Sequence, residues 1–260
     1  PAPYYRHDAD IFKSGAYAQA LVATYAGCAA LSRLIRGVGV VPDGVVGFAG
    51  GDLAAMMRSG VAGSEMSRPD RVDIIRSIYG IVDKAVNHGG LPTVSMITVI
   101  LRRPDDDNEI VGTFPPDKVA LAVELTPRQK TYAVKPDYEE SFISAFANAG
   151  IRTMKLDLDR PFNTALCESL VPAIRKFASL KMKHSPVYDI YSCATADKVP
   201  AQLKTIRNDM AERWARPVLF DKTVRRMYAD GYRVFIEVGP RGLMTAAIED
   251  TLKGEVHAAV

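Results

Sequence analysis

Hydrophobic positions in the first third of the chain recur at helical spacing, with one short strand among them. The stretch 16–39 is rich in Ala and Leu and predicts a helix. Residues 42–44, Pro-Asp-Gly, predict a turn, and Val45-Val46 with their flanks predict a short buried strand. The stretches 52–62 and 68–90 predict two further helices, so this part of the chain is expected to be mostly helical.

The periodicity changes near residue 93, where short runs suited to strands replace the helices. Three such runs cover 93–101, 118–125 and 129–136. The stretch 137–150 then has helical spacing, and 151–158 is again typical of a strand. Three strands, a helix and a strand in such close succession predict a small α+β unit that is inserted into a larger domain.

Strands and helices alternate again after residue 160. The predicted order is a helix, a strand, a helical region broken at Pro217, a strand and a helix, at 164–180, 187–193, 199–231, 232–240 and 242–252. Alternation at both ends of the chain predicts an α/β fold, in which helices cover both faces of a mostly parallel sheet. We place the large domain at 1–92 and 159–260 and the small insert at 93–158.

Composition and charge narrow the range of function classes. Of the 260 residues, 48% are hydrophobic and 24% are charged, which is typical of a globular protein with a sizeable core. The net charge is +3, and the basic residues are scattered without interleaved aromatic residues, which argues against nucleic-acid binding. No apolar run reaches the roughly 18 residues that a membrane span needs. We therefore expect a cytoplasmic domain that does not contact a membrane.

The cysteine and histidine positions give no sign of a metal site. Cys28, Cys167 and Cys193 are widely spaced and form no CxxC pair, which is typical of a reducing compartment. We expect no metal and no cofactor. His184 is interpreted as a surface loop residue, and the acidic run 105–109 as a loop tip, because it lacks the spacing of an EF-hand. The chain begins without methionine, which suggests a piece of a longer protein or a processed product.

One short stretch has the layout of a catalytic turn. The strand at Val45-Val46 runs into Gly47-Phe48-Ala49-Gly50-Gly51, and a helix follows. In a nucleophile elbow, such a strand–turn–helix unit projects a nucleophile above the sheet, and N–H groups at the start of the helix stabilise an oxyanion. Ala49 stands where the nucleophile would be. Taken alone, the pattern also suits a plain turn.

Three stretches resemble the acyltransferase family of fatty acid and polyketide synthases, the malonyl-CoA:acyl-carrier-protein transacylases. Residues 38–60 are similar to the elbow segment of that family without a gap, including Gly47 and Gly51. Residues 215–252 resemble its closing segment, and 149–168 resemble the strand and loop that carry its histidine. The resemblance implies an α/β-hydrolase-like large domain with a parallel sheet, a small ferredoxin-like insert and a cleft between them.

The resemblance also implies a role for each site position. In that family an elbow serine attacks an acyl-CoA thioester, and a histidine acts as general base in a ping-pong transfer. The serine position falls on Ala49 and the histidine position on Asn163, and neither side chain can take that role. The histidine that precedes the serine corresponds to Phe48. The arginine that holds a malonyl carboxylate corresponds to Tyr79, and Arg76, one turn earlier, is the candidate for a partial substitute.

Four altered positions predict a pseudo-acyltransferase domain of a larger synthase. The turn itself is kept, with the N–H of Gly50 near the expected oxyanion position. The expected role is structural, in docking or in carrier-protein binding, and the expected partners are ketosynthase-like neighbouring domains, an acyl carrier protein and acyl-CoA. Two alternatives stay open. One is an acyltransferase that works with unusual residues or was inactivated by engineering, and the other is a module that binds acyl or pantetheine groups.

Overall fold

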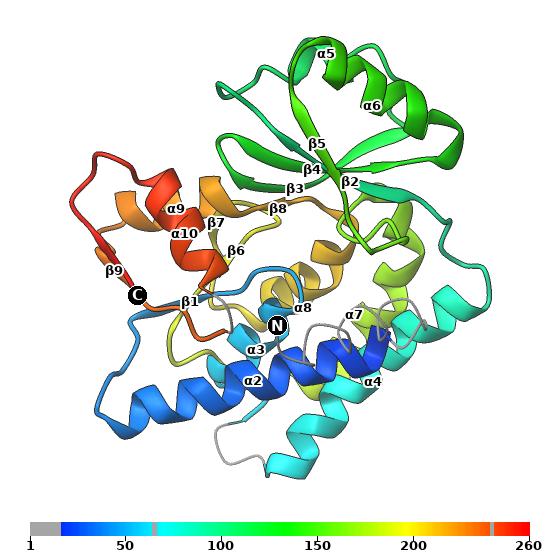
Figure 1. Ribbon diagram of the computed structural model, residues 1–260. Helices are drawn as coiled ribbons and strands as arrows, with labels where there is room; N and C mark the ends of the chain where they lie inside the picture. The colour runs from blue at the N-terminus through cyan, green and yellow to red at the C-terminus, as the bar shows by residue number, and fades with distance from the viewer. Residues whose placement is uncertain (1–16, 64–66, 240–241) are drawn as a thin grey trace, which may run out of the picture.

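The structure, a computed structural model, describes residues 17–63, 67–239 and 242–260. Figure 1 shows a lower body of helices around short strands and an upper sheet that lies against this body. From Tyr17 the described chain runs through the lower body, crosses to the upper sheet and then returns. Among the described residues, no helix has both the length and the apolar character needed to span a membrane.

Short parallel strands lie at the centre of the lower body. β1 (Gly44–Val46) is parallel to β6 (Asp189–Ser192). The other strands here are β7 (Asp197–Lys198), which is antiparallel to β6, and β9 (Val234–Phe235) and β10 (Ala258–Ala259), which are parallel to each other. The expected strand at 232–240 is therefore confirmed in place, but it is much shorter than its apolar run.

Helices cover both faces of β1 and β6. One face is covered by α2 (Tyr17–Gly37), α3 (Gly51–Arg58), α4 (Arg68–Asn87), α7 (Val171–Lys181) and α8 (Leu203–Glu212), and the other by α9 (Phe220–Ala229) and α10 (Leu243–Thr251). Val45 and Ile190 pack into the core on the first side, and Val46 and Tyr191 pack into the core on the second. This alternation follows from the two-residue period of a strand. The predicted α/β fold with both faces covered is confirmed.

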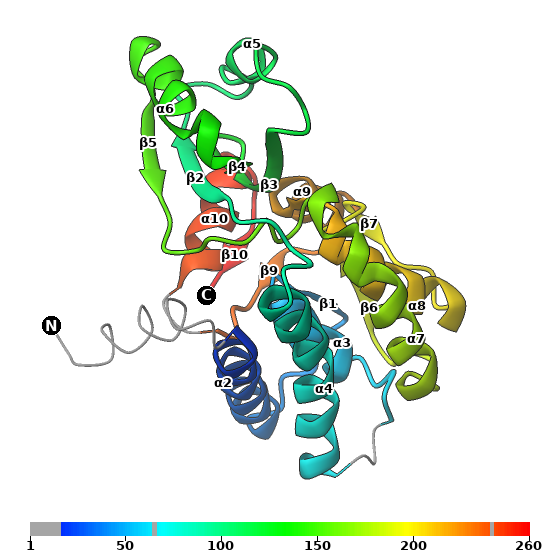
Figure 2. The same cartoon turned by 90° about the vertical axis from the view of Figure 1, so that its right-hand side faces the viewer.

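The upper sheet has the strand order β5-β2-β4-β3, with every neighbouring pair antiparallel. Its strands are β2 (Ser95–Ile100), β3 (Val119–Thr126), β4 (Gln129–Val134) and β5 (Arg152–Lys155). α6 (Glu139–Asn148) joins β4 to β5 and lies along one face of the sheet (Figure 2). Its Phe142 and Phe146 pack onto that face. The connection from β2 to β3 contains only the short α5 (Asn108–Val111). This order is ferredoxin-like, as the resemblance implied.

A strand from the later part of the chain extends this sheet. β8 (Val218–Leu219) pairs parallel to β3, with Val123 opposite Val218. The break that was predicted at Pro217 therefore contains a strand, and main-chain hydrogen bonds join the upper sheet to the lower body. The insert proposed at 93–158 holds the four other strands of the sheet.

Capping residues and prolines explain where two of the expected helices begin. α4 begins at Arg68, as predicted, because the hydroxyl of Ser67 caps the helix by accepting from the Asp70 N–H at 3.3 Å. The expected helix at 164–180 is a 3₁₀ segment, Ala165–Leu170, followed by α7. Pro in the first turn of α7 marks this boundary, since proline suits the start of a helix.

Candidate functional site

The turn between β1 and α3 has the backbone of an elbow. Ala49 has a φ of +47°, a left-handed conformation that costs about 1–2 kcal/mol for a residue with a Cβ. The N–H groups of Gly51 and Asp52 donate to the carbonyls of Phe48 at 2.8 Å and Ala49 at 3.1 Å. A Cβ on Gly47 would lie 2.2 Å from the Cα of Asp52, so only glycine fits there. The turn thus has elbow geometry with a methyl group at its central position.

Phe48, which precedes the centre of the turn, is a packing residue. Its ring is half-buried and lies edge-on to Phe220, with the ring centroids 5.6 Å apart and the planes at 86°. It packs against the same apolar cluster that contains Tyr191 and Phe235. An edge-to-face pair of this kind stabilises the fold through burial and ring electrostatics.

Tyr79 lies against the turn, whereas Arg76 does not. The Tyr79 hydroxyl donates to the carbonyl of Gly50 at 3.4 Å, and its ring packs on Trp214 with centroids 6.0 Å apart. Burial raises the pKa of Tyr79, so its phenol stays neutral. The Arg76 side chain is 69% exposed and lies 3.9 Å from Asp73 on the same helix. Arg76 is therefore not among the residues that the structure gathers at the turn.

Asn163 is held on both its main chain and its side chain. Its φ is +64°, a conformation that asparagine adopts more readily than most residues. Its N–H donates to the carbonyl of Trp214 at 3.1 Å, and its side-chain amide donates to the carbonyl of Arg213 at 3.0 Å. The neighbouring Phe162 ring also packs on Trp214. The amide group thus has a fixed position and a hydrogen-bond partner.

Arg213 connects the turn to the loop of Asn163. Its guanidinium lies 2.7 Å from the carboxylate of Asp52, three residues after Ala49, and also pairs with Asp209. The three charged side chains are only 7–9% exposed. Because the Arg213 carbonyl accepts from Asn163, one residue holds both the helix behind the turn and the loop that faces it.

Burial and charge shift the pKa values in this cluster. Burial raises the pKa of Asp52 to about 7, against the effect of Arg213, and the nearby Asp209 raises it further. Burial lowers the pKa of Arg213, but the two carboxylates outweigh burial and hold it above its ordinary value.

The sequence places Asp52 only at the start of a helix. The four-residue spacing of Asp209 and Arg213 is the signal that would have indicated an ion pair.

The cysteine thiols are packing groups. Cys167 and Cys193 are buried, and the Cys193 thiol donates to the carbonyl of Gly47 at 3.2 Å. Burial raises the pKa of Cys167 to about 12, and burial also raises the pKa of Cys193 and of Cys28. Thiols with raised pKa values are poor nucleophiles. Among the described residues, no three His, Cys, Asp or Glu side chains gather as a metal site would require.

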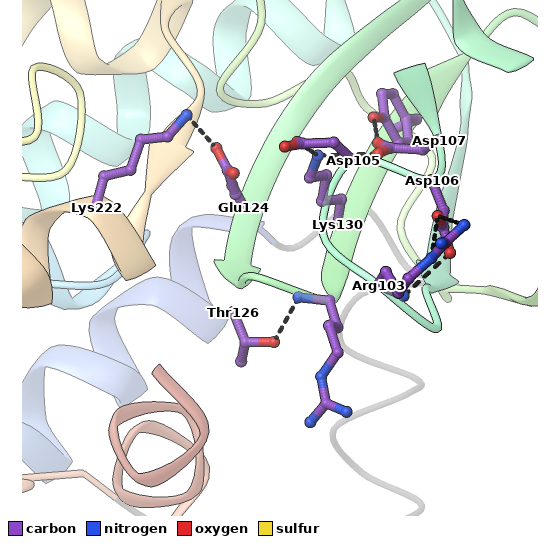
Figure 3. A network of polar contacts seen from close by, with 10 residues as sticks. Arg103, Asp105, Asp106, Asp107, Glu124, Thr126, Lys130 and Lys222 are labelled. Carbon is purple, nitrogen blue, oxygen red and sulfur yellow. Dashed lines mark hydrogen bonds and ion pairs between the residues drawn. The ribbon is translucent and has the colours of Figure 1, made fainter. Parts of the chain in front are cut away.

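The acidic run 105–109 is anchored from within the upper sheet (Figure 3). The Nζ atom of Lys130 lies 2.9 Å from Asp107 and 3.3 Å from Asp105, and the hydroxyl of Tyr132 donates to Asp107. Asp107 is fully buried, and Lys130 is 5% exposed. The lysine compensates these carboxylates. The loop tip predicted at 105–109 is only partly correct, because residues 105–107 form a turn, whereas Asn108 and Glu109 begin α5 and Asp107 is buried.

Charged pairs continue from this network to the lower body. Glu124 on β3 stands opposite Lys130 on β4, and it pairs with Lys222 of α9 at 2.9 Å (Figure 3). The Glu124 side chain is 9% exposed, so this ion pair is only partly screened by water. The upper sheet is therefore held to α9 by charge as well as by β8.

Two surface cavities lie away from the turn. One, of about 620 Å³, is lined by residues of the connection from β2 to β3 such as Arg102, Arg103 and Glu109. The other, of about 280 Å³, lies beside β6 and β7 and is lined by residues that include Tyr188 and Lys198. Neither cavity is lined by Ala49 or Asn163, so neither belongs to the elbow site.

Comparison with known proteins identifies the family. The family model described as "Acyl transferase domain" matches residues 16–260, and the chain therefore belongs to this family. Polyketide synthase GfsA of Streptomyces halstedii is 28% identical over 230 residues, which are 87% of this chain and 3% of that protein. The 6-methylsalicylic acid synthase of Penicillium patulum is 26% identical over 236 residues, 89% of this chain and 12% of that protein. The chain thus spans only a small part of the length of these relatives.

Solved structures have the same fold. The acyltransferase domain from the second module of the salinomycin polyketide synthase has a TM-score of 0.75 at 24% identity, over 96% of this chain and 56% of that chain. A malonyl-transacylase in complex with a type II polyketide synthase acyl-carrier protein has a TM-score of 0.81 at 18% identity, over 94% of this chain and 76% of that chain. At these identities the likeness establishes the fold, and the expected family is confirmed.

Proposed function

We propose that this chain is a catalytically inactive acyltransferase-like domain of a polyketide-type synthase, with a structural or docking role. The observation that carries the proposal is an elbow backbone at Ala49, with a φ of +47°, whose side chain has no nucleophilic atom. Asn163 supplies an amide, which does not accept a proton at neutral pH. Since removal of a catalytic dyad costs about 10⁶-fold in rate, acyl transfer through this turn would be negligible.

The packing around the turn supports a structural role. The Phe48 ring packs on Phe220, and the Tyr79 hydroxyl donates to the carbonyl of Gly50. These groups bury apolar surface and offer no cation for a malonyl carboxylate. In a synthase, such a domain would contribute its surface as a binding site for other domains. We propose neighbouring ketosynthase-like domains and an acyl carrier protein as its partners.

Acyl-enzyme formation tests this proposal. The chain is incubated with radiolabelled malonyl-CoA and, separately, acetyl-CoA, and protein-bound label is measured after acid quenching. We expect no protein-bound label, because the side chain of Ala49 has no nucleophilic atom that could attack the thioester. A stable label on the unchanged chain would overturn the proposal.

Restoring the side chains supplies the positive control. In the double variant Ala49→Ser with Asn163→His, the imidazole Nδ1–H can replace the asparagine amide as donor to the Arg213 carbonyl. The other ring nitrogen is then free to accept the serine proton. Label on this variant validates the assay. Equal label on Ala49→Ser alone would indicate an acyltransferase that was inactivated at one position, and would contradict the proposed decay of the whole site.

A further inference from the structure

Exposed apolar side chains gather at the end of α2. Leu34, Val38 and Val41 are 68%, 80% and 65% exposed. They lie in the last turn of α2 and in the loop that leads to β1. Single exposed apolar residues are common, but three within the stretch 34–41 form a local patch, and such patches mark contact sites.

Arginines accompany this patch. Arg33 and Arg36 are three positions apart on α2 and so project from one face of the helix, and Arg58 lies at the end of α3. In the described part of the chain, none of these three forms an ion pair with a carboxylate. Burial lowers the pKa of Arg58, and the neighbouring Arg36 and Arg71 lower it further. The mutual repulsion of these cations would be relieved by an acidic partner.

The loop after α2 holds the valines in a defined position. Gly39 has a φ of +90°, and its N–H donates to the carbonyl of Arg36 at 3.0 Å. The N–H of Val40 donates to the carbonyl of Ile35 at 3.3 Å. These two bonds form a Schellman motif, which closes the helix on a left-handed glycine. The patch is thus presented by ordered backbone, which reduces the entropy cost of binding.

This patch lies at the opposite end of β1 from the elbow turn. β1 runs from Gly44 to Val46 and then toward Ala49, whereas the patch precedes Gly44. In Figure 1 the end of α2 lies at the lower left, away from the upper sheet. A partner that binds here would leave the turn uncovered.

We propose that the α2-end face, defined as Arg33, Leu34, Arg36, Val38 and Val41, docks an acidic amphipathic helix of the synthase that contains this domain. Charge complementarity favours this occupant over a second copy of the chain, which would bring like arginines together. An amphipathic helix offers an apolar stripe for the three apolar residues and carboxylates for the arginines. The inference rests on the proposed docking function.

A synthetic acidic helix tests the face directly. The probe is a fluorescein-labelled peptide of about 18 residues, with leucines on one face and glutamates elsewhere, and the full chain is titrated into it by fluorescence anisotropy. We expect saturable binding that weakens as NaCl increases. Arg36→Glu and Val38→Ser should each weaken binding about tenfold or more. Arg152→Glu, at an exposed position of β5, is the matched control and should leave binding unchanged.

Several results would overturn the docking face. These are an absence of saturable binding, an unchanged affinity in Arg36→Glu, or equal binding of a peptide with glutamine in place of glutamate. Tighter binding to phosphatidylserine vesicles than to the peptide would assign the face to a lipid surface instead. Acyl-enzyme labelling of the unchanged chain, measured beside the peptide titration, separates the two proposals. Label on the unchanged chain overturns the inactive function alone, whereas a failed peptide titration overturns the docking face alone.

Discussion

The side-chain amide of Asn163 donates to the main-chain carbonyl of Arg213 at 3.0 Å, and the guanidinium of the same arginine lies 2.7 Å from Asp52 behind the elbow turn. The two segments that carry Ala49 and Asn163 are thus held to one residue. The loss of one member of a buried ion cluster leaves the others uncompensated, which is strongly destabilising. This penalty gives a physical reason for the elbow turn and the loop of Asn163 to keep their relative positions.

Arg213→Met should therefore lower the free energy of unfolding by about 3–5 kcal/mol, because Asp52 and Asp209 would remain buried without a counter-charge. Urea denaturation followed by circular dichroism measures this change. The defect should be larger at pH 8 than at pH 5, where Asp52 can take up a proton. Arg175→Met removes a pair with Glu212 whose partners are 43% and 39% exposed, and should cost less than about 1 kcal/mol. Equal losses in the two variants would mean that the buried cluster contributes little.

Gly47→Ala should destabilise the chain severely, while Gly51→Ala should not. A Cβ at position 47 would meet the Cα and N atoms of Asp52 at 2.2 and 2.4 Å, and these backbone atoms cannot move without opening the turn. We expect a loss of more than about 3 kcal/mol. A Cβ at position 51 meets no atom within 4 Å and would stabilise the first turn of α3 by up to about 1 kcal/mol. Differential scanning calorimetry measures the melting temperatures of both variants. Similar melting temperatures would contradict the claim that the turn has no room for a Cβ at position 47.

The sequence predicted the elements with strong periodicity and missed those that depend on distant partners. The strands of the upper sheet and α4 were placed within a few residues, because their apolar spacing matches their burial. β8 was missed, since Val218–Leu219 is too short to show a period and is defined by its pairing with β3. The short length of β9 was also missed. The end of a strand is set by its pairing with other strands, and an apolar run does not show where that pairing stops.

The sequence indicated the local part of the candidate site and missed the contacts between residues that are distant in the sequence. The elbow turn has a local signature, and the resemblance indicated that Ala49 and Asn163 occupy altered positions. Arg213 was not found, because its partner Asp52 is far away in the sequence and only the fold brings them together. Arg76 was suggested as a partial substitute for a lost arginine, yet its side chain lies in solvent beside Asp73.

Ala49→Gly should stabilise the chain, in contrast to most changes to glycine. At a φ of +47° the removal of Cβ relieves about 1–2 kcal/mol, which exceeds the added entropy of the unfolded chain. We expect a net gain of about 0.5–1 kcal/mol in the free energy of unfolding. Ala145→Gly within α6 is the control and should lower it by about 1 kcal/mol. If both variants lose stability equally in denaturant titrations, the turn stores no strain.

Burial of Asp52 should make stability depend on pH between about 4 and 7. Its pKa rises from 3.8 in the unfolded chain to about 7 in the folded chain, so the folded chain binds this proton more tightly. The associated stability is complete below pH 4, falls as the pH rises and is lost above pH 7, with a total on the order of 4 kcal/mol. Asp221, whose pKa burial raises to about 6, acts in the same direction.

The measurement is the melting temperature of Asp52→Asn minus that of the unchanged chain across this pH range. Because asparagine is neutral at every pH, the difference should rise steadily from pH 4 to pH 7 and then become constant. Asp73→Asn, which removes a 72% exposed carboxylate, is the control for the loss of a carboxylate as such. A flat difference for Asp52→Asn would mean that the ion pair with Arg213 keeps Asp52 ionised throughout this pH range.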